Sequence, residues 1–140
     1  MKMTTKQIGN ITEVAVMLAF LQQGYNVLTP YGNCERYDFV VDINNRFYKI
    51  QVKTASDQNG KIVIPTSSTN YSGGKWIRNK YTDEEIDFFA TTYNNQAYLI
   101  PIVDCGGREI SLRYEPTKNG QISGIKWLKD YKLEEVVNKL

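Results

Sequence analysis

Polar and apolar residues alternate on both sides of the pair Asn44-Asn45. The apolar, β-branched run Phe39-Val40-Val41 precedes the pair, and the alternating segment 46–53 follows it. Asn tolerates the positive φ that a two-residue hairpin turn requires, so this pattern predicts a β-hairpin centred on the pair. Because side chains on a strand alternate between two faces, the register is fixed by counting outward from the turn.

Three polar side chains fall on one face of this predicted hairpin. The register places Asp38 directly opposite Gln51, with Lys53 one step farther along the same face. Opposed side chains have Cβ atoms roughly 5 Å apart, so the Asp38 carboxylate and the Gln51 amide oxygen can share one cation. A site for a hard cation with an ammonium group beside it suits phosphate chemistry.

The N-terminal segment predicts one helix. Thr4 and Gln7 have the spacing of a capping box, and Gly24 suits the left-handed turn that ends a helix. Residues 14–21 are apolar on nearly every face, which predicts a largely buried helix. Glu13 lies at the edge of this run, and two positions remain open for it: the exposed side of the helix, or the side that faces the hairpin.

The rest of the chain predicts further strands and one short helix. We expect strands at Tyr25–Thr29, Lys61–Pro65, Ile86–Tyr93, Ala97–Val103 and Glu109–Tyr114, a second hairpin turn at Asn94-Asn95, and a helix at Leu133–Leu140. Turn residues in Tyr31-Gly32-Asn33 follow Pro30, and the small polar residues of 66–74 predict a mobile loop.

Charge is unevenly distributed although the net charge is only +2. Residues 61–80 contain four basic residues and no acid, and residues 83–87 contain four acids and no base. Basic side chains can bind phosphates, and aromatic side chains can stack on bases. Within residues 75–80, such side chains are Lys75, Trp76, Arg78 and Lys80. The alternative for Trp76 is that it anchors a long loop to the core.

Length and composition limit the class of protein. A chain of 140 residues is most simply one domain, 1–140, and its lack of histidine excludes Ser-His and Cys-His nucleophile pairs and imidazole zinc sites. Cys34 and Cys105 lack metal-ligand spacing, so we expect free thiols in a reducing compartment. No secretory signal or membrane span is evident, and we expect a soluble cytoplasmic protein without membrane contact.

The segments RYDFVVD, YKIQVKTA and IDFFATTYNNQAYLIPI resemble the PD-(D/E)xK nuclease superfamily. The similarity is greatest to its small endonucleases, a group that includes a cyanobacterial group I intron homing endonuclease. The resemblance implies an α/β (α+β) fold with a restriction-endonuclease-like core, in which a mixed β-sheet is flanked by helices. It also implies a site-specific, Mg²⁺-dependent DNA endonuclease that leaves 5′-phosphate and 3′-hydroxyl ends.

The resemblance assigns a role to each site residue. Asp38 is the central metal-binding carboxylate, Lys53 is the motif lysine and Glu13 is the helical acid. Gln51 stands where an acid is usual, and the backbone carbonyl of Val52 joins the metal ligands. Gln51 removes one negative charge from the site, but an amide oxygen still binds Mg²⁺, and the similar endonucleases also have Gln there. Tyr37 replaces the name-giving proline.

The resemblance makes double-stranded DNA the expected partner, and no organic cofactor is expected. The candidates for DNA contact are Lys75, Trp76, Arg78, Lys80, Arg108 and Arg113. Cutting both strands with one site per chain calls for a symmetric homodimer or a homotetramer. Two alternatives remain open. One is a Holliday-junction resolvase or repair nuclease of the same fold, and the other is a non-catalytic DNA-binding module that kept the hairpin for stability.

Overall fold

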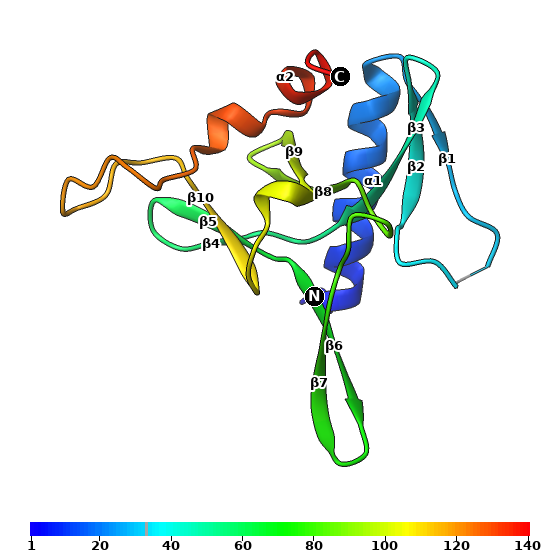
Figure 1. Ribbon diagram of the computed structural model, residues 1–140, viewed down its shortest axis with the longest axis horizontal. Coiled ribbons are helices and arrows are strands. Elements are labelled where there is room, and N and C mark those ends of the chain that lie inside the picture. The colour runs from blue at the N-terminus through cyan, green and yellow to red at the C-terminus, as the bar shows by residue number, and fades with distance from the viewer. Residues whose placement is uncertain (33) are drawn as a thin grey trace.

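A five-stranded mixed sheet forms the centre of the computed structural model, which describes residues 1–32 and 34–140 (Figure 1). Asn33, the last residue of the expected turn after Pro30, lies outside the described residues. The sheet has the order β1-β2-β3-β8-β9, and its strands are β1 (Asn26–Leu28), β2 (Phe39–Ile43), β3 (Arg46–Val52), β8 (Phe88–Tyr93) and β9 (Gln96–Pro101). Only the β3–β8 pair within this sheet is parallel, which confirms the expected mixed sheet.

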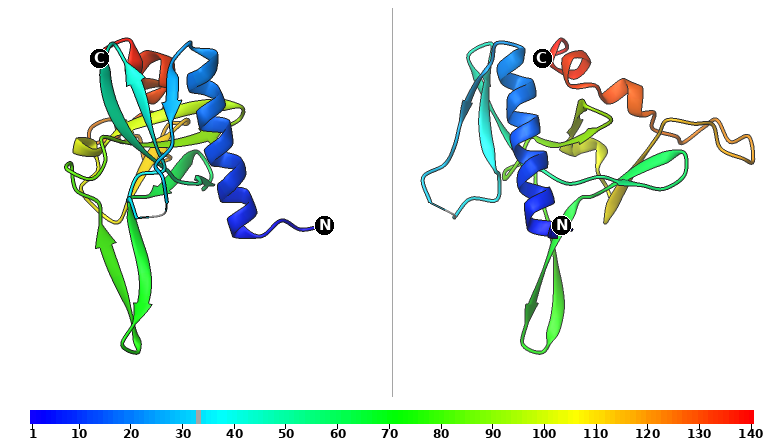
Figure 2. Two further views of the ribbon diagram at one scale, coloured as in Figure 1. Left: turned by 90° about the vertical axis from the view of Figure 1, so that its right-hand side faces the viewer. Right: turned by 180° about the vertical axis from the view of Figure 1, so that it is seen from behind.

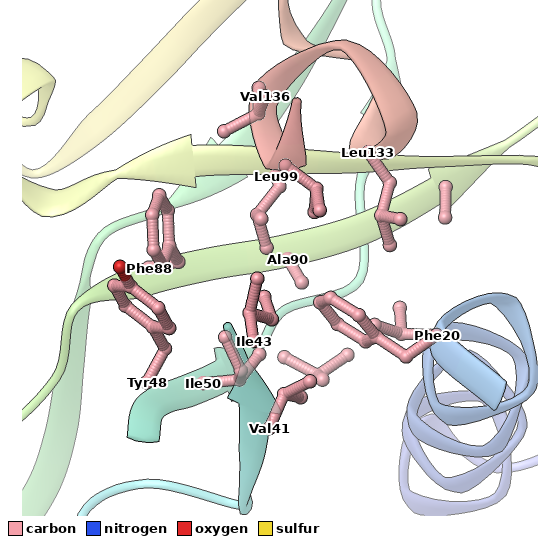
Figure 3. Packing of buried hydrophobic residues seen from close by; sticks show 14 of the residues in the cluster. Phe20, Val41, Ile43, Tyr48, Ile50, Phe88, Ala90, Leu99, Leu133 and Val136 are labelled. Carbon is pink, nitrogen blue, oxygen red and sulfur yellow. The ribbon is translucent and has the colours of Figure 1, made fainter. Parts of the chain in front are cut away.

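Two helices cover one face of the central sheet (Figure 3). Helix α1 (Thr5–Gln22) begins with the predicted capping box at Thr4, and Gly24 has a φ of 87° just after its end. The short helix α2 (Leu133–Val137) packs on the same apolar cluster as Phe20 of α1. Two 3-10 helices, η1 (Ile102–Asp104) and η2 (Leu128–Tyr131), lie between β9 and α2 in the chain. No helix among the described residues is long and apolar enough to cross a membrane.

The prediction that α1 is largely buried is wrong. Only Thr12, Val16 and Phe20 are buried, because the sheet contacts one side of the helix. The outer side is apolar but exposed, with exposed fractions of 55% for Ile11, 58% for Val14, 51% for Leu18 and 53% for Leu21. In the single chain, helix α1 therefore has an uncovered apolar face.

A second, smaller sheet covers the opposite face of the central sheet at β8 and β9. It has the order β10-β5-β4, formed by β4 (Ser56–Asp57), β5 (Lys61–Pro65) and β10 (Glu109–Arg113). Ile62 and Leu112 of this sheet pack with Phe89 and Ile100 of the central sheet. The strands expected from the sequence are all present, with bounds that differ by up to two residues.

The expected loop at residues 66–74 and the basic segment after it form a projecting hairpin. Strands β6 (Ser67–Ser72) and β7 (Lys75–Lys80) pair around Gly73-Gly74, whose φ values are 59° and 81° (Figures 1 and 2). Every residue of β7 is exposed. The loop prediction was wrong because a ribbon with both faces in solvent has no apolar alternation to identify it.

Candidate active site

The β2–β3 hairpin has the predicted turn and register. Asn44 and Asn45 have φ values of 54° and 64°, and the pairing runs from Ile43 with Arg46 to Phe39 with Ile50. The side chains that alternate on β3 behave as expected, since Tyr48, Ile50 and Val52 are buried and Lys49 and Gln51 are half-buried. The hairpin therefore turns one polar face of β3 away from the helices.

Asp38 lies one residue beyond the last residue of β2. Its own N–H donates to the Ile50 carbonyl at 2.8 Å, and its Oδ2 accepts the Val52 N–H at 2.7 Å. The carboxylate thus lies against the edge of β3. The N–H and C=O groups of one strand residue leave from the same edge, so the Val52 carbonyl also lies on the edge that faces Asp38.

Helix α1 brings Glu13 to the same end of the hairpin. The buried Thr12 lies with its Oγ1 3.3 Å from Oγ1 of Thr54, so the middle of α1 contacts the segment that follows β3. Burial raises the pKa of Glu13, and the negative charge of Asp38 raises it further. Of the two positions left open for Glu13, the structure supports the one that faces the hairpin.

Asp38 is held in an environment that disfavours its charge. Burial raises the pKa of Asp38, while the Val52 N–H and the positive charge of Lys53 act in the opposite direction. The Asp38 carboxylate therefore lies within electrostatic reach of one acid, Glu13, and one base, Lys53. Two carboxylates this close repel each other when both are charged, and a cation bound between them would relieve that repulsion.

The donors around this point fit a hard divalent cation. Within residues 1–32 and 34–140 there is no group of three or more His, Cys, Asp or Glu side chains that could hold a metal. The available ligands are instead the carboxylates of Glu13 and Asp38, the Gln51 amide and the Val52 carbonyl. All are oxygens, which Mg²⁺ prefers, and Mg²⁺ commonly keeps several waters beside one or two carboxylates.

Lys53 is placed by two contacts. Its N–H donates to the Ala90 carbonyl at 2.9 Å, which continues the β3–β8 pairing, and its Nζ lies 5.0 Å from the centroid of the Tyr81 ring. The same ring lies 3.8 Å from Cζ of Arg36. Sequence reasoning gave Arg36 no role and expected Tyr81 to be an exposed member of the basic and aromatic segment, whereas Tyr81 is half-buried against Phe89. The one available signal was the position of Arg36, two residues before Asp38.

The predicted DNA-contacting residues separate into two locations. Lys75, Trp76, Arg78 and Lys80 all lie on the exposed strand β7. Trp76 is 72% exposed, so the alternative that it anchors a loop to the core is wrong. Arg108 lies at the base of this hairpin, where its carbonyl accepts the Thr66 N–H at 2.9 Å.

Arg113 lies elsewhere, at the other end of β10. Its guanidinium donates to the carbonyls of Glu115 at 2.9 Å and Pro116 at 3.3 Å. It also lines a cavity of about 440 Å³ with Lys61 and Lys126, and none of the four candidate catalytic residues lines that cavity. The structure therefore does not bring Arg113 together with the β7 residues.

Comparisons with known proteins identify the family and the fold. The sequence model of the PD-(D/E)XK endonucleases matches residues 3–134. The fold is similar to that of a bacterial homing endonuclease, I-Ssp6803I, with a TM-score of 0.79 and 24% sequence identity over 98% of this chain and 95% of that chain. No curated protein sequence matches the chain.

Two aspartates with opposite pKa shifts allow a test of the site's electrostatics. Because the fold raises the pKa of Asp38, the charged form of this carboxylate destabilises the folded protein. Asp38→Asn removes this charge, so the free energy of unfolding without metal is expected to stay the same or to increase. Hydrogen bonds from the Tyr114 and Tyr93 hydroxyls lower the pKa of Asp57, so Asp57→Asn is expected to destabilise the protein.

Urea unfolding with EDTA, followed from pH 7 downward, measures both effects. The difference in the free energy of unfolding between wild type and Asp38→Asn should disappear as the pH falls through the raised pKa of Asp38 and the carboxylate becomes protonated. The cost of Asp57→Asn should vanish only at lower pH, as Asp57 becomes protonated in the folded state. A greater loss of stability at pH 7 for Asp38→Asn than for Asp57→Asn would contradict the assignment.

Proposed function

Since the chain belongs to the PD-(D/E)XK endonuclease family, we propose that it is a Mg²⁺-dependent endonuclease that cuts double-stranded DNA at specific sites. The convergence of Glu13, Asp38 and Lys53 at one end of the β2–β3 hairpin carries the proposal. Two acids and one lysine around an open strand edge suit hydrolysis of a phosphodiester, whose transition state gains negative charge.

The four oxygen donors described above would hold Mg²⁺. Asp38, the Gln51 amide and the Val52 carbonyl would bind it directly, and Glu13 directly or through water. When bound, the cation polarises the phosphoryl oxygen and lowers the pKa of bound water. Gln51 contributes no charge, so the substrate phosphate supplies part of the negative charge that balances the cation.

Lys53 and Asp38 have separate tasks in the hydrolysis. The Lys53 ammonium holds the attacking water and offsets the charge that develops on the phosphate. The water oxygen forms a bond to phosphorus while the bond from phosphorus to the 3′ oxygen breaks. The attacking water releases one proton to solvent and the 3′ oxygen takes one proton from solvent, which leaves a 5′-phosphate and a 3′-hydroxyl. The hydrogen bond from the Val52 N–H fixes Oδ2 of Asp38, so the carboxylate keeps its orientation during the reaction.

The β6–β7 hairpin is the proposed DNA-binding element. A two-stranded ribbon fits the major groove of duplex DNA. The alternation along β7 places Trp76, Arg78 and Lys80 on one face of the ribbon and Lys75 on the other, so basic side chains reach phosphates on both sides. Arg108 extends this basic surface at the base of the hairpin.

The exposed face of α1 is the proposed contact with a second copy of the chain. Ile11, Val14, Leu18 and Leu21 follow a spacing of three and four residues, as in a coiled-coil contact. This stripe is uncharged, so it can pack against itself across a two-fold axis without burying unpaired charge. The homodimer, alone or paired into a homotetramer, then supplies one site for each DNA strand.

Lys53→Met tests the hydrolytic assignment. Mg²⁺-dependent cleavage of plasmid and phage DNA should fall by at least about a hundredfold, because the charge that stabilises the transition state is removed. Lys49→Met is the control, since Lys49 lies on the same face of β3 and donates to the Glu84 carbonyl. Equal activity of Lys53→Met and wild type would exclude the assignment, and cutting of four-way junctions alone would favour the resolvase alternative.

Lys75→Ala combined with Arg78→Ala tests the DNA-binding hairpin. Each lost phosphate contact should lower the slope of log affinity against log salt by about 0.9. Fluorescence anisotropy in EDTA at several salt concentrations measures this slope. Lys118→Ala, in the loop after β10, serves as the control, and a slope identical in all three proteins would rule the hairpin out as the binding element.

Leu18→Glu tests the α1 contact. The wild type should sediment as a dimer or a larger oligomer. Leu18→Glu should sediment as a monomer, because burying a carboxylate on an apolar contact is costly. Val103→Glu introduces the same charge at another apolar side chain, which is 82% exposed, and should leave the oligomer intact. A monomeric wild type, or a dimer that tolerates Leu18→Glu, would show that α1 is not the contact.

A further inference from the structure

Arg36 holds the base of the β6–β7 hairpin. Its Nη1 donates to the Lys80 carbonyl at 2.6 Å and to both carboxylate oxygens of Glu85, at 3.0 and 3.2 Å. Its Nη2 donates to Oγ of Ser68 at 3.0 Å and to the Asn79 carbonyl at 3.4 Å. Its donors are thus directed at protein groups, so Arg36 acts as a structural link between the segment before Asp38 and both strands of the hairpin.

Tyr81 joins this link to the candidate site. It directly follows β7, and its ring packs edge-on with Phe89 at a centroid distance of 5.3 Å and an interplanar angle of 88°. Phe89 is the β8 partner of Gln51 in the parallel pairing. Arg36 and Lys53 both contact the Tyr81 ring, at 3.8 and 5.0 Å from its centroid. One aromatic ring therefore connects the end of the hairpin to the lysine of the site.

We propose that Tyr81, held by Arg36, is a positioning residue that keeps the Lys53 ammonium beside Asp38 and makes this placement depend on the base of the DNA-binding hairpin. The proposal rests on the proposed function of the site. Lysine has a flexible four-carbon stem, and the face of an aromatic ring restricts where its ammonium lies. The Glu85 carboxylate offsets the charge of Arg36, which lets two cations share the neighbourhood of one ring.

These contacts connect the β6–β7 hairpin to both Asp38 and Lys53. Arg36 is two residues before Asp38 in the chain, and Tyr81 contacts Lys53 through space. When DNA engages the exposed strand β7, a displacement of Lys80 and Tyr81 is transmitted to Arg36 and to the Lys53 ammonium. Tyr81 thus affects the rate of cleavage once DNA is bound, and it affects DNA affinity far less.

The test compares Tyr81→Leu with Tyr81→Phe and with Tyr31→Leu as a control on a fully exposed tyrosine. Tyr81→Leu removes the aromatic ring but keeps apolar volume, and Tyr81→Phe restores the ring. With saturating DNA and Mg²⁺, Tyr81→Leu should lower the single-turnover cleavage rate by about tenfold to a hundredfold. Tyr81→Phe and Tyr31→Leu should cleave at the wild-type rate, and the DNA affinity of all three variants should change far less than the rate of Tyr81→Leu.

A second measurement reports the contact without cleavage. The ring current of Tyr81 should displace the NMR signals of the Lys53 ε-methylene group, assigned by their loss in Lys53→Arg. The displacement should persist in Tyr81→Phe and disappear in Tyr81→Leu. Thermal unfolding identifies any variant that fails to fold. In that case Arg36→Lys, which keeps the charge but lacks the planar fork, replaces Tyr81→Leu and should lower the same rate.

The outcomes separate this inference from the proposed function. An active wild type whose rate is matched by Tyr81→Leu, or a Lys53 signal that is indifferent to Tyr81, would overturn the positioning role alone. Loss of rate in both Tyr81→Leu and Tyr81→Phe would assign the effect to the hydroxyl and also overturn it. A wild type that cleaves no DNA with Mg²⁺ would overturn the proposed function together with this inference.

Discussion

The hydrogen bond from the Val52 N–H to the Asp38 carboxylate, 2.7 Å long, is the contact on which the arrangement of the site depends. It forms because the pairing of β2 with β3 stops at Phe39, which frees the edge of β3 for a side chain. The bond holds a negative charge in a half-buried place, near a second acid, Glu13, whose pKa is also raised. The repulsion within such a pair is relieved by a proton, by the Lys53 ammonium or by a divalent cation.

The layers of the fold leave this charged point accessible. The helices cover one face of the central sheet, and the small β10-β5-β4 sheet covers the other face at β8 and β9, so the polar face of β3 at Gln51 stays half-buried. Glu13, Asp38 and Lys53 are likewise half-buried, so the site keeps contact with solvent. The projecting β6–β7 hairpin adds a basic ribbon. Tyr81, the residue after β7, contacts both Arg36 and Lys53.

Local signals in the sequence predicted the hairpin and its register, because Asn44-Asn45 fixes the turn and each side chain then has a defined face. The capping box at Thr4 and the second turn at Asn94-Asn95 were equally local, and both are confirmed. Burial of α1 was mispredicted because composition does not show which side of a helix the sheet covers. The β6–β7 hairpin was missed because both of its faces lie in solvent and show no apolar alternation. The contacts of Arg36 with Lys80 and with the Tyr81 ring were missed because they join residues far apart in the chain, which no spacing rule reveals.

The most direct test of a cation site at this strand edge is paramagnetic NMR with Mn²⁺, which accepts the same oxygen ligands as Mg²⁺. Small additions of Mn²⁺ to the wild-type protein should broaden the backbone amide signals of Asp38, Gln51 and Val52 first, and Asp38→Asn should abolish this selective broadening. Broadening that begins at the acidic segment 83–87, or that is unchanged in Asp38→Asn, would contradict the account.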